Sequence, residues 1–212
     1  MSAYDHEEQE QLAAIKGWWN QYGGLALLAV TLILGAAAAW NGWQWYQRSK
    51  AVEAGQVYVE LQRVAGTKDL GKVKAAAGSI VENYPRTIYA PLAALTSAKA
   101  HFDGNDLKTA RVQLQWVVDN ARDPEIQSIA RMRLATLLID EKAYDDALKV
   151  LDAKHDDAFA GRFLEVRGDV LAAAGRKADA RTAYKAAMDK ADPRDPTARE
   201  LLQMKLDGLG DA

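Results

Sequence analysis

The chain has 212 residues, a formal net charge of −2 and no cysteine. The lack of cysteine excludes disulfides, thiolate metal sites, a cysteine nucleophile and a lipid-modified N-terminal cysteine. The near-neutral charge provides no electrostatic basis for a nucleic-acid partner.

The first predicted segment is an acidic N-terminal tail, residues 1–21. It carries four carboxylates before residue 11 and a single lysine, Lys16. A secretory signal peptide begins with a short basic segment, so this tail argues against one. The small residues at 36–39 would offer a cleavage site, and cleavage is the alternative. We expect an uncleaved anchor.

The second predicted segment is a transmembrane helix, residues 22–46. Its apolar part, Gly23 to Trp40, has no ionisable side chain. As a helix this part is about 27 Å long, close to the roughly 30 Å hydrocarbon core of a bilayer. Aromatic residues flank it as two belts suited to lipid headgroups, so membrane lipid is an expected partner. The belts comprise Trp18, Trp19, Tyr22, Trp40, Trp43, Trp45 and Tyr46. The alternative is a buried helix of a soluble domain.

The third predicted segment, residues 51–212, is a helical domain. Alanine is abundant, and apolar residues recur at helical spacing between regularly placed breakers. The breakers are Gly66, Pro85, Gly104-Asn105, Pro124, Gly175, Pro193 and Pro196. This pattern predicts a series of helical hairpins.

One hairpin matches the tetratricopeptide pattern, a helix–turn–helix unit of about 34 residues. Small residues alternate with larger ones at positions where two helices would pack, and a glycine occupies the turn. The matching residues are Gly168, Leu171, Gly175, Ala180, Tyr184 and Ala187.

Weaker copies precede this unit at spacings of 33 and 37 residues. Ala147 and Leu151 correspond to Ala180 and Tyr184, but Glu141-Lys142 stands where the turn glycine is expected. A last helix, Pro196 to Leu206, is expected to cap the stack. The predicted fold is therefore all-α: one N-terminal transmembrane helix followed by a tetratricopeptide-like helical repeat solenoid. The alternative is an irregular helical bundle.

In such a stack the first helix of each unit lines a concave face, which suits an extended segment or a partner helix. The register of the last unit predicts which residues lie there. The predicted partner-binding groove comprises Tyr58, Gln62, Leu95, Lys99, Met132, Thr136, Arg162, Glu165 and Asp169. The alternative is that these are ordinary surface and core residues in a misjudged register. Trp116 is expected between repeats.

No catalytic residues are predicted, and we expect no metal, cofactor or small-molecule substrate. His101 falls at a packing position, and His155 lies in a polar run expected to be a solvated loop. Neighbouring carboxylates such as Asp156 and Asp157 lie in predicted exposed segments rather than facing one site. The sequence therefore predicts a protein that is not an enzyme.

Two stretches resemble the YfgM family, an ancillary subunit of the bacterial SecYEG translocon. They are EQLAAIKGWWNQYG at 10–23 and YPRTIYAPLAAL at 84–95. The resemblance implies a single-pass bacterial inner-membrane protein with a cytoplasmic N-terminus and a periplasmic tetratricopeptide-like domain. It implies association with SecYEG and with a PpiD-type membrane-anchored periplasmic chaperone. The implied function is to help transfer secreted proteins to periplasmic chaperones.

The flanking charges indicate the opposite topology. Lys16 precedes the apolar segment, whereas Arg48 and Lys50 follow it. A positive-inside count places the repeat domain in the cytoplasm, although long domains can translocate against so small a bias. A cytoplasm-facing tetratricopeptide regulatory protein is therefore the alternative function.

Overall fold

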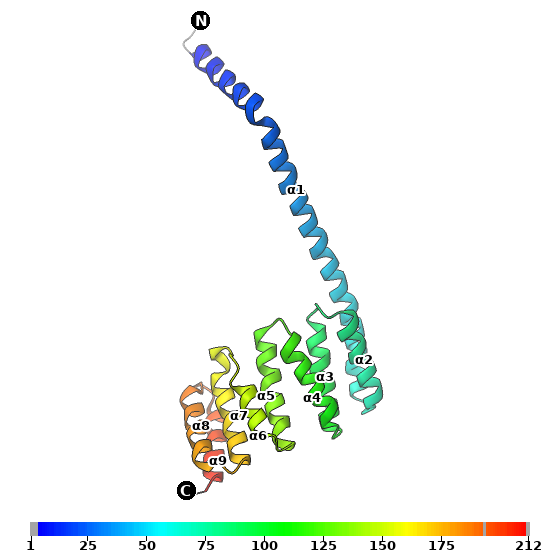
Figure 1. Cartoon of the computed structure of the whole chain (residues 1–212), viewed down its shortest axis with the longest axis vertical. Coiled ribbons are helices and arrows are strands. Elements are labelled where there is room, and N and C mark those ends of the chain that lie inside the picture. The colour runs from blue at the N-terminus through cyan, green and yellow to red at the C-terminus, as the bar shows by residue number, and fades with distance from the viewer. Residues whose placement is uncertain (1–3, 193, 211–212) are drawn as a thin grey trace. The chain divides into compact units, whose positions relative to one another are not determined.

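The computed structural model describes residues 4–192 and 194–210 (Figure 1). These residues form α helices and one short 3₁₀ helix, and none of them forms a strand, which confirms the all-α prediction. The helices are α1 (Tyr4–Ala65), α2 (Leu70–Asn83), α3 (Tyr89–Asp103), α4 (Leu107–Asn120), α5 (Pro124–Asp140), α6 (Tyr144–Leu151), η1 (Asp157–Phe159), α7 (Ala160–Ala173), α8 (Lys177–Lys190) and α9 (Pro196–Gly208). The chain divides into two compact units, one up to Lys50 and one from Ala51 onward.

The N-terminal unit is the part of α1 up to Lys50. Among the described helices, α1 alone is long and apolar enough to cross a membrane, and 6% of its apolar window is buried. Its polar side chains bond back to the helix: Thr31 Oγ1 donates to the carbonyl of Leu27 (2.8 Å) and Asn41 Nδ2 to that of Ala37 (3.0 Å). Such bonds lower the cost of placing polar groups in lipid. Each aromatic residue of the predicted belts is at least 42% exposed. The unit fits a single membrane span.

The second unit begins with residues 51–65 of α1 and continues as antiparallel hairpins. The turns of these hairpins share one backbone feature: a residue with positive φ at Lys68 (60°), Asn105 (62°), Lys142 (59°) and Gly175 (76°). In the last three turns the next backbone N–H bonds to the carbonyl five residues earlier, as in Arg176 to Leu171 (2.8 Å). This arrangement ends a helix and satisfies its last carbonyls. The turn predicted at Gly175 is therefore confirmed, and Lys142 adopts the same conformation without being glycine.

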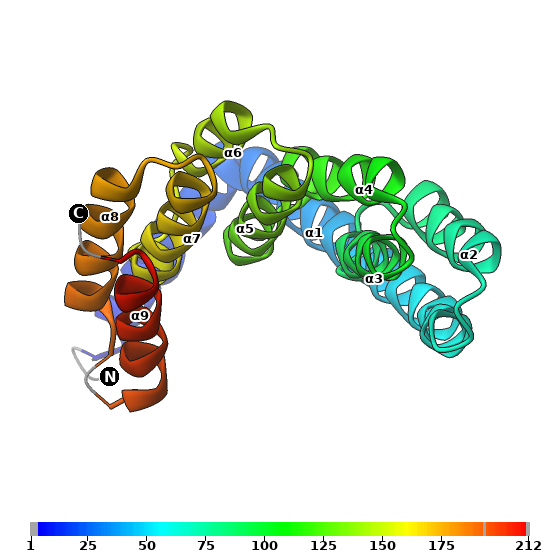
Figure 2. The ribbon, with the colours of Figure 1, turned by 90° about the horizontal axis from the view of Figure 1, so that it is seen from below.

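The hairpins stack in two layers (Figure 2). Residues 51–65, α3, α5 and α7 form the inner layer, and α2, α4, α6 and α8 form the outer layer. Small residues allow close approach between the layers: a Cβ atom added to Gly168 would overlap the ring of Tyr184. The predicted packing residues Ala147, Leu151 and Ala180 are buried as well. The tetratricopeptide-like stack is confirmed.

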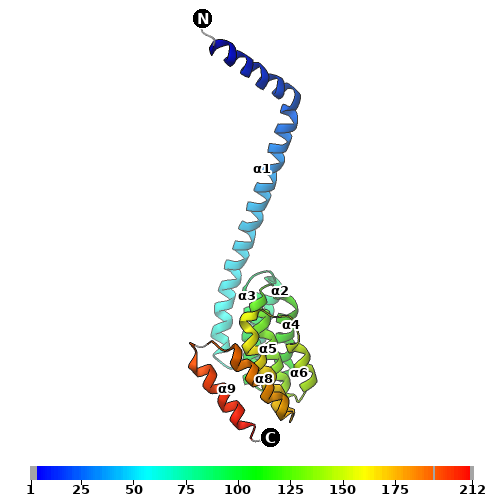
Figure 3. The same ribbon diagram turned by 90° about the vertical axis from the view of Figure 1, so that its left-hand side faces the viewer.

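The predicted capping helix is α9, which lies beside α8 at the C-terminal end (Figures 2 and 3). It begins at Pro196, as predicted, and continues to Gly208. Leu202, Leu206 and Leu209 pack into the same apolar cluster as Tyr184. Burial of these side chains holds the helix against the end of the stack.

The structure also tests the sequence predictions for Trp116 in α4 and for His155. Trp116 is half-buried against the core between repeats, as expected. His155 does lie in a loop, but its ring stacks on Phe163 (centroids 3.9 Å apart, planes 9° apart). The prediction of a merely solvated His155 was wrong, because the loop returns over the start of α7 and the imidazole covers an apolar ring.

Candidate partner-binding groove

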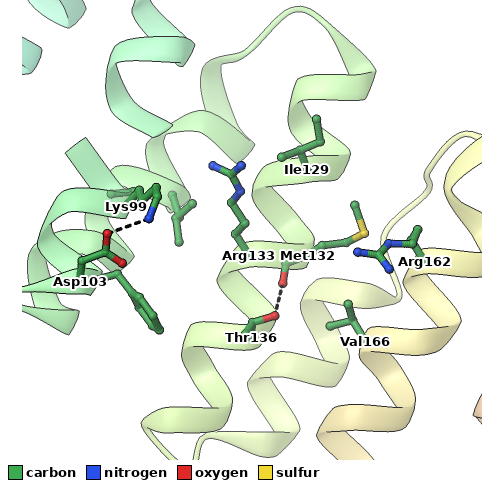
Figure 4. Close-up of a pocket in the computed structure, with 11 residues that line it drawn as sticks. Lys99, Asp103, Ile129, Met132, Arg133, Thr136, Arg162 and Val166 are labelled. Carbon is green, nitrogen blue, oxygen red and sulfur yellow. Dashed lines mark hydrogen bonds and ion pairs between the residues drawn. The ribbon is translucent and has the colours of Figure 1, made fainter. Parts of the chain in front are cut away.

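The inner layer of the repeat domain is hollowed at its centre. Two adjoining hollows, of about 600 and 470 Å³, lie along α3, α5 and neighbouring helices. They share four lining residues: Lys99, Asp103, Ile129 and Arg133. We call the two hollows together the central groove. Figure 4 shows the larger one, with Lys99 and Asp103 from α3 facing side chains of α5 and α7.

Most of the predicted groove residues line these hollows. Tyr58 and Leu95 line the smaller one, Lys99 lines both, and Met132, Thr136 and Arg162 line the larger. They come from the first helix of successive hairpins, as the repeat register requires. Leu95 is 7% exposed and so forms part of the floor.

The three other predicted residues do not line the groove. Gln62 is exposed on α1. Glu165 and Asp169 are engaged by α9: Lys205 Nζ lies 2.8 Å from Glu165 Oε1 and 2.7 Å from Asp169 Oδ1. The side chains of α9 therefore satisfy the carboxylates at this end of the inner layer.

Sequence reasoning missed several lining residues, of which the principal ones are Phe102, Asp103, Ile129, Arg133 and Val166. Each lies one, three or four positions from a predicted residue on the same helix. Helical spacing therefore contained the signal, because residues three or four apart share one face. Only the packing angle between helices decides how wide that face is.

Hydrogen bonds already engage much of the polar lining. Lys99 Nζ pairs with Asp103 Oδ2 (2.7 Å), and Arg162 Nη1 pairs with Glu165 Oε2 (2.6 Å). Thr136 Oγ1 donates to the carbonyl of Met132 (3.0 Å). Arg133 is exposed and has no hydrogen-bond or ion-pair partner among the described residues. The groove therefore presents apolar side chains around one unpaired guanidinium.

Tyr184 of α8 joins the contacts between Lys205, Glu165 and Asp169, because its hydroxyl donates to Asp169 Oδ1 (2.8 Å). Burial, this hydrogen bond and the nearby negative charges raise the pKa of Tyr184 well above its ordinary value. The phenol therefore stays protonated and acts as a donor. These contacts join α7, α8 and α9.

His101 is a buried residue of α3. His101 is 2% exposed, as the packing prediction expected, and its Nδ1 lies 3.0 Å from Asp106 Oδ2. Within the described residues, no three His, Asp or Glu side chains are placed to hold a metal ion.

Comparison with known proteins supports the repeat architecture. A family model described as a tetratricopeptide repeat-like domain matches residues 16–211. A protein of Neisseria gonorrhoeae named ancillary SecYEG translocon subunit is 36% identical over 207 residues, covering 96% of this chain and 97% of that protein. Proteins with the same name from Escherichia coli and Aggregatibacter actinomycetemcomitans are 30% and 28% identical, over 99% and 98% of this chain and 99% and 100% of theirs. No solved structure matches.

Proposed function

Because this chain belongs to the YfgM family of ancillary SecYEG translocon subunits, we propose that it is a membrane-anchored interaction scaffold associated with the Sec translocon. The observation that carries the proposal is the extent of the match. The relatives align with 96–99% of the chain, so the anchor and the repeat domain occur together in them.

The two units fit such a function in complementary ways. The apolar part of α1 restricts the protein to a membrane, and the repeat domain offers an apolar groove lined with cationic groups. Tethering raises the effective concentration of a binding surface beside its partners without any new contact. We infer that the protein binds other proteins and catalyses no reaction, and that it needs no cofactor, small molecule or nucleic acid.

The finer proposal concerns location and partners. We place the protein in the bacterial inner membrane with its N-terminus in the cytoplasm and its repeat domain in the periplasm. Its partners are SecYEG, a PpiD-type membrane-anchored chaperone and, through the aromatic belts, membrane lipid. Its function is to help transfer secreted proteins from the translocon to periplasmic chaperones. The family resemblance supports the location, the protein partners and the transfer function, and the exposed aromatic belts support the lipid contact.

The opposite topology has one observation in its favour, the pair Arg48 and Lys50 on the C-terminal side of the span against Lys16 on the other. Protease added to intact spheroplasts separates the two. Digestion of the repeat domain without lysis is expected. Protection until lysis would contradict the periplasmic placement and favour a cytoplasm-facing regulatory protein.

Association with the translocon is tested separately by mild crosslinking in native membranes, followed by purification of the tagged chain. We expect SecYEG subunits to co-purify with the full-length protein, and the yield to fall when residues 51–212 are replaced by an unrelated soluble domain. If SecYEG is absent from the crosslinked full-length sample, the scaffold proposal is wrong.

A further inference from the structure

The charges lining the central groove are unequal. Three cations, Lys99, Arg133 and Arg162, line it together with one carboxylate, Asp103. Lys99 is paired with that carboxylate, and Arg162 is paired with Glu165 outside the groove. Arg133 lines both hollows and has no partner in the described part of the chain. The groove is therefore locally positive in a protein whose net charge is −2.

Apolar side chains surround this guanidinium. Phe102 is 38% exposed, and Ile129, Met132 and Val166 are half-buried along the same surface. In Figure 4 Arg133 projects from α5 toward the side of Lys99, while Met132 lies on the side of Arg162. An occupant that covers this surface would remove apolar area from water on both sides of one positive charge, which favours an amphipathic partner.

The backbone of the groove limits the conformation of its occupant. The walls are helices whose N–H and C=O groups bond within each helix, and the described residues contain no strand edge. A peptide buried here finds no backbone partner, and the lining offers few side-chain acceptors for its N–H groups. A helix satisfies its own N–H groups, whereas a desolvated extended segment does not.

We propose that the central groove binds an amphipathic α helix of a partner protein, with an apolar stripe against Phe102 and Met132 and a carboxylate bonded to Arg133. A guanidinium only donates hydrogen bonds, and its planar fork matches a carboxylate in a bidentate pair. This inference rests on the proposed scaffold function and names the chemistry of the partner. It requires an acidic helix rather than an unfolded client segment.

The test uses the full-length protein in detergent and a labelled peptide whose leucines repeat at i, i+3, i+4 and i+7, with glutamates beside that stripe. Fluorescence anisotropy gives the Kd. Two matched peptides carry glutamine or lysine in place of the glutamates, and a third carries a central proline that breaks the helix. We expect about tenfold weaker binding of the glutamine peptide, weaker binding still of the lysine peptide, and loss of binding by the proline peptide.

In the Arg133→Glu variant we expect the lysine peptide to bind more tightly than the glutamate peptide, the reverse of wild type. Arg133 is exposed, so folding should be unaffected, and circular dichroism checks this. The matched control is Lys185→Glu, the same change of charge on α8 outside the groove, which should leave all Kd values unchanged.

Equal binding of the glutamate and glutamine peptides, or an unchanged order in Arg133→Glu, would overturn the carboxylate contact. Equal binding of the proline peptide would overturn the helix. Crosslinking of the wild-type chain to SecYEG is measured independently. A negative peptide result with intact crosslinking therefore rejects this inference alone, whereas lost crosslinking rejects the proposed function.

Discussion

The Nζ atom of Lys205 lies 2.8 Å from Oε1 of Glu165, although the two residues are 40 positions apart in the chain. Glu165 is 7% exposed, and Lys205 also bonds both carboxylate oxygens of Asp169. One ammonium thus compensates two carboxylates on neighbouring turns of α7. The capping helix is held by charge as well as by its leucines.

Lys205→Met is therefore expected to destabilise the domain by about 2 kcal/mol, because buried Glu165 is left with Arg162 alone and Asp169 with only the hydroxyl of Tyr184. Urea unfolding followed by circular dichroism measures this loss. Adding Glu165→Gln should recover part of it, since one of the two carboxylates that lost the ammonium is then neutral. Lys185→Met, at an exposed position of α8, is the control and should change stability by less than about 0.5 kcal/mol.

The contact between Gly168 and Tyr184 makes a second prediction. Gly168→Ala places a methyl group against the tyrosine ring in the interface of α7 and α8, and we expect a loss of about 2 kcal/mol. Gly78→Ala is the matched change on α2, where the added Cβ would meet nothing within 4 Å beyond its own helix backbone and chain neighbours. It should stabilise the protein by about 1 kcal/mol, because alanine restricts the unfolded chain more than glycine does. Equal effects of both variants in thermal unfolding would contradict the close packing.

A substitution in the turn between α5 and α6 is expected to stabilise the domain. Lys142 has φ 59°, a conformation that costs a residue with a Cβ atom about 1 kcal/mol and glycine almost nothing. Lys142→Gly is therefore expected to raise the thermal midpoint. The reverse change in the equivalent turn, Gly175→Ala at φ 76°, should lower it. If Lys142→Gly were destabilising, the left-handed turn would not be present in solution.

The N-terminal cap of α2 should make the stability of the domain depend on pH in the acidic range. Asp69 accepts from the backbone N–H of Lys72 (3.1 Å) and pairs with its ammonium, and these interactions lower the pKa of Asp69 below its ordinary 3.8. A lowered folded-state pKa contributes stability that is present above 3.8 and is lost as the pH falls through the folded value. Asp69→Asn keeps a capping oxygen but cannot titrate, so it should lose less stability below pH 3.8 than wild type does.

Unfolding midpoints measured from neutral to acidic pH test this prediction. Asp189→Asn, at an exposed position within α8, serves as the control for removing a carboxylate that caps no helix. Parallel acid profiles for wild type and Asp69→Asn would show that the cap carries no charge-dependent stability.

Local chemistry made much of this structure predictable. Proline at the start of α5 and α9, glycine or asparagine in the turns, and helical spacing of apolar residues all act within a few positions of each other. The same local rules identified the apolar part of α1 as a membrane span and Gly168, Ala180 and Tyr184 as packing residues. These features depend on backbone preferences and on the period of a helix, both of which a sequence displays directly.

Other features were decided only by tertiary structure. Lys142 adopts a left-handed turn because packing on both sides of it outweighs its own preference. Arg133, missed in the sequence, lines both hollows, while Glu165 and Asp169 contact Lys205 of α9. The sequence determined which helix each side chain belongs to. The angles and distances between helices decided which side chains meet, because those depend on how whole faces pack together.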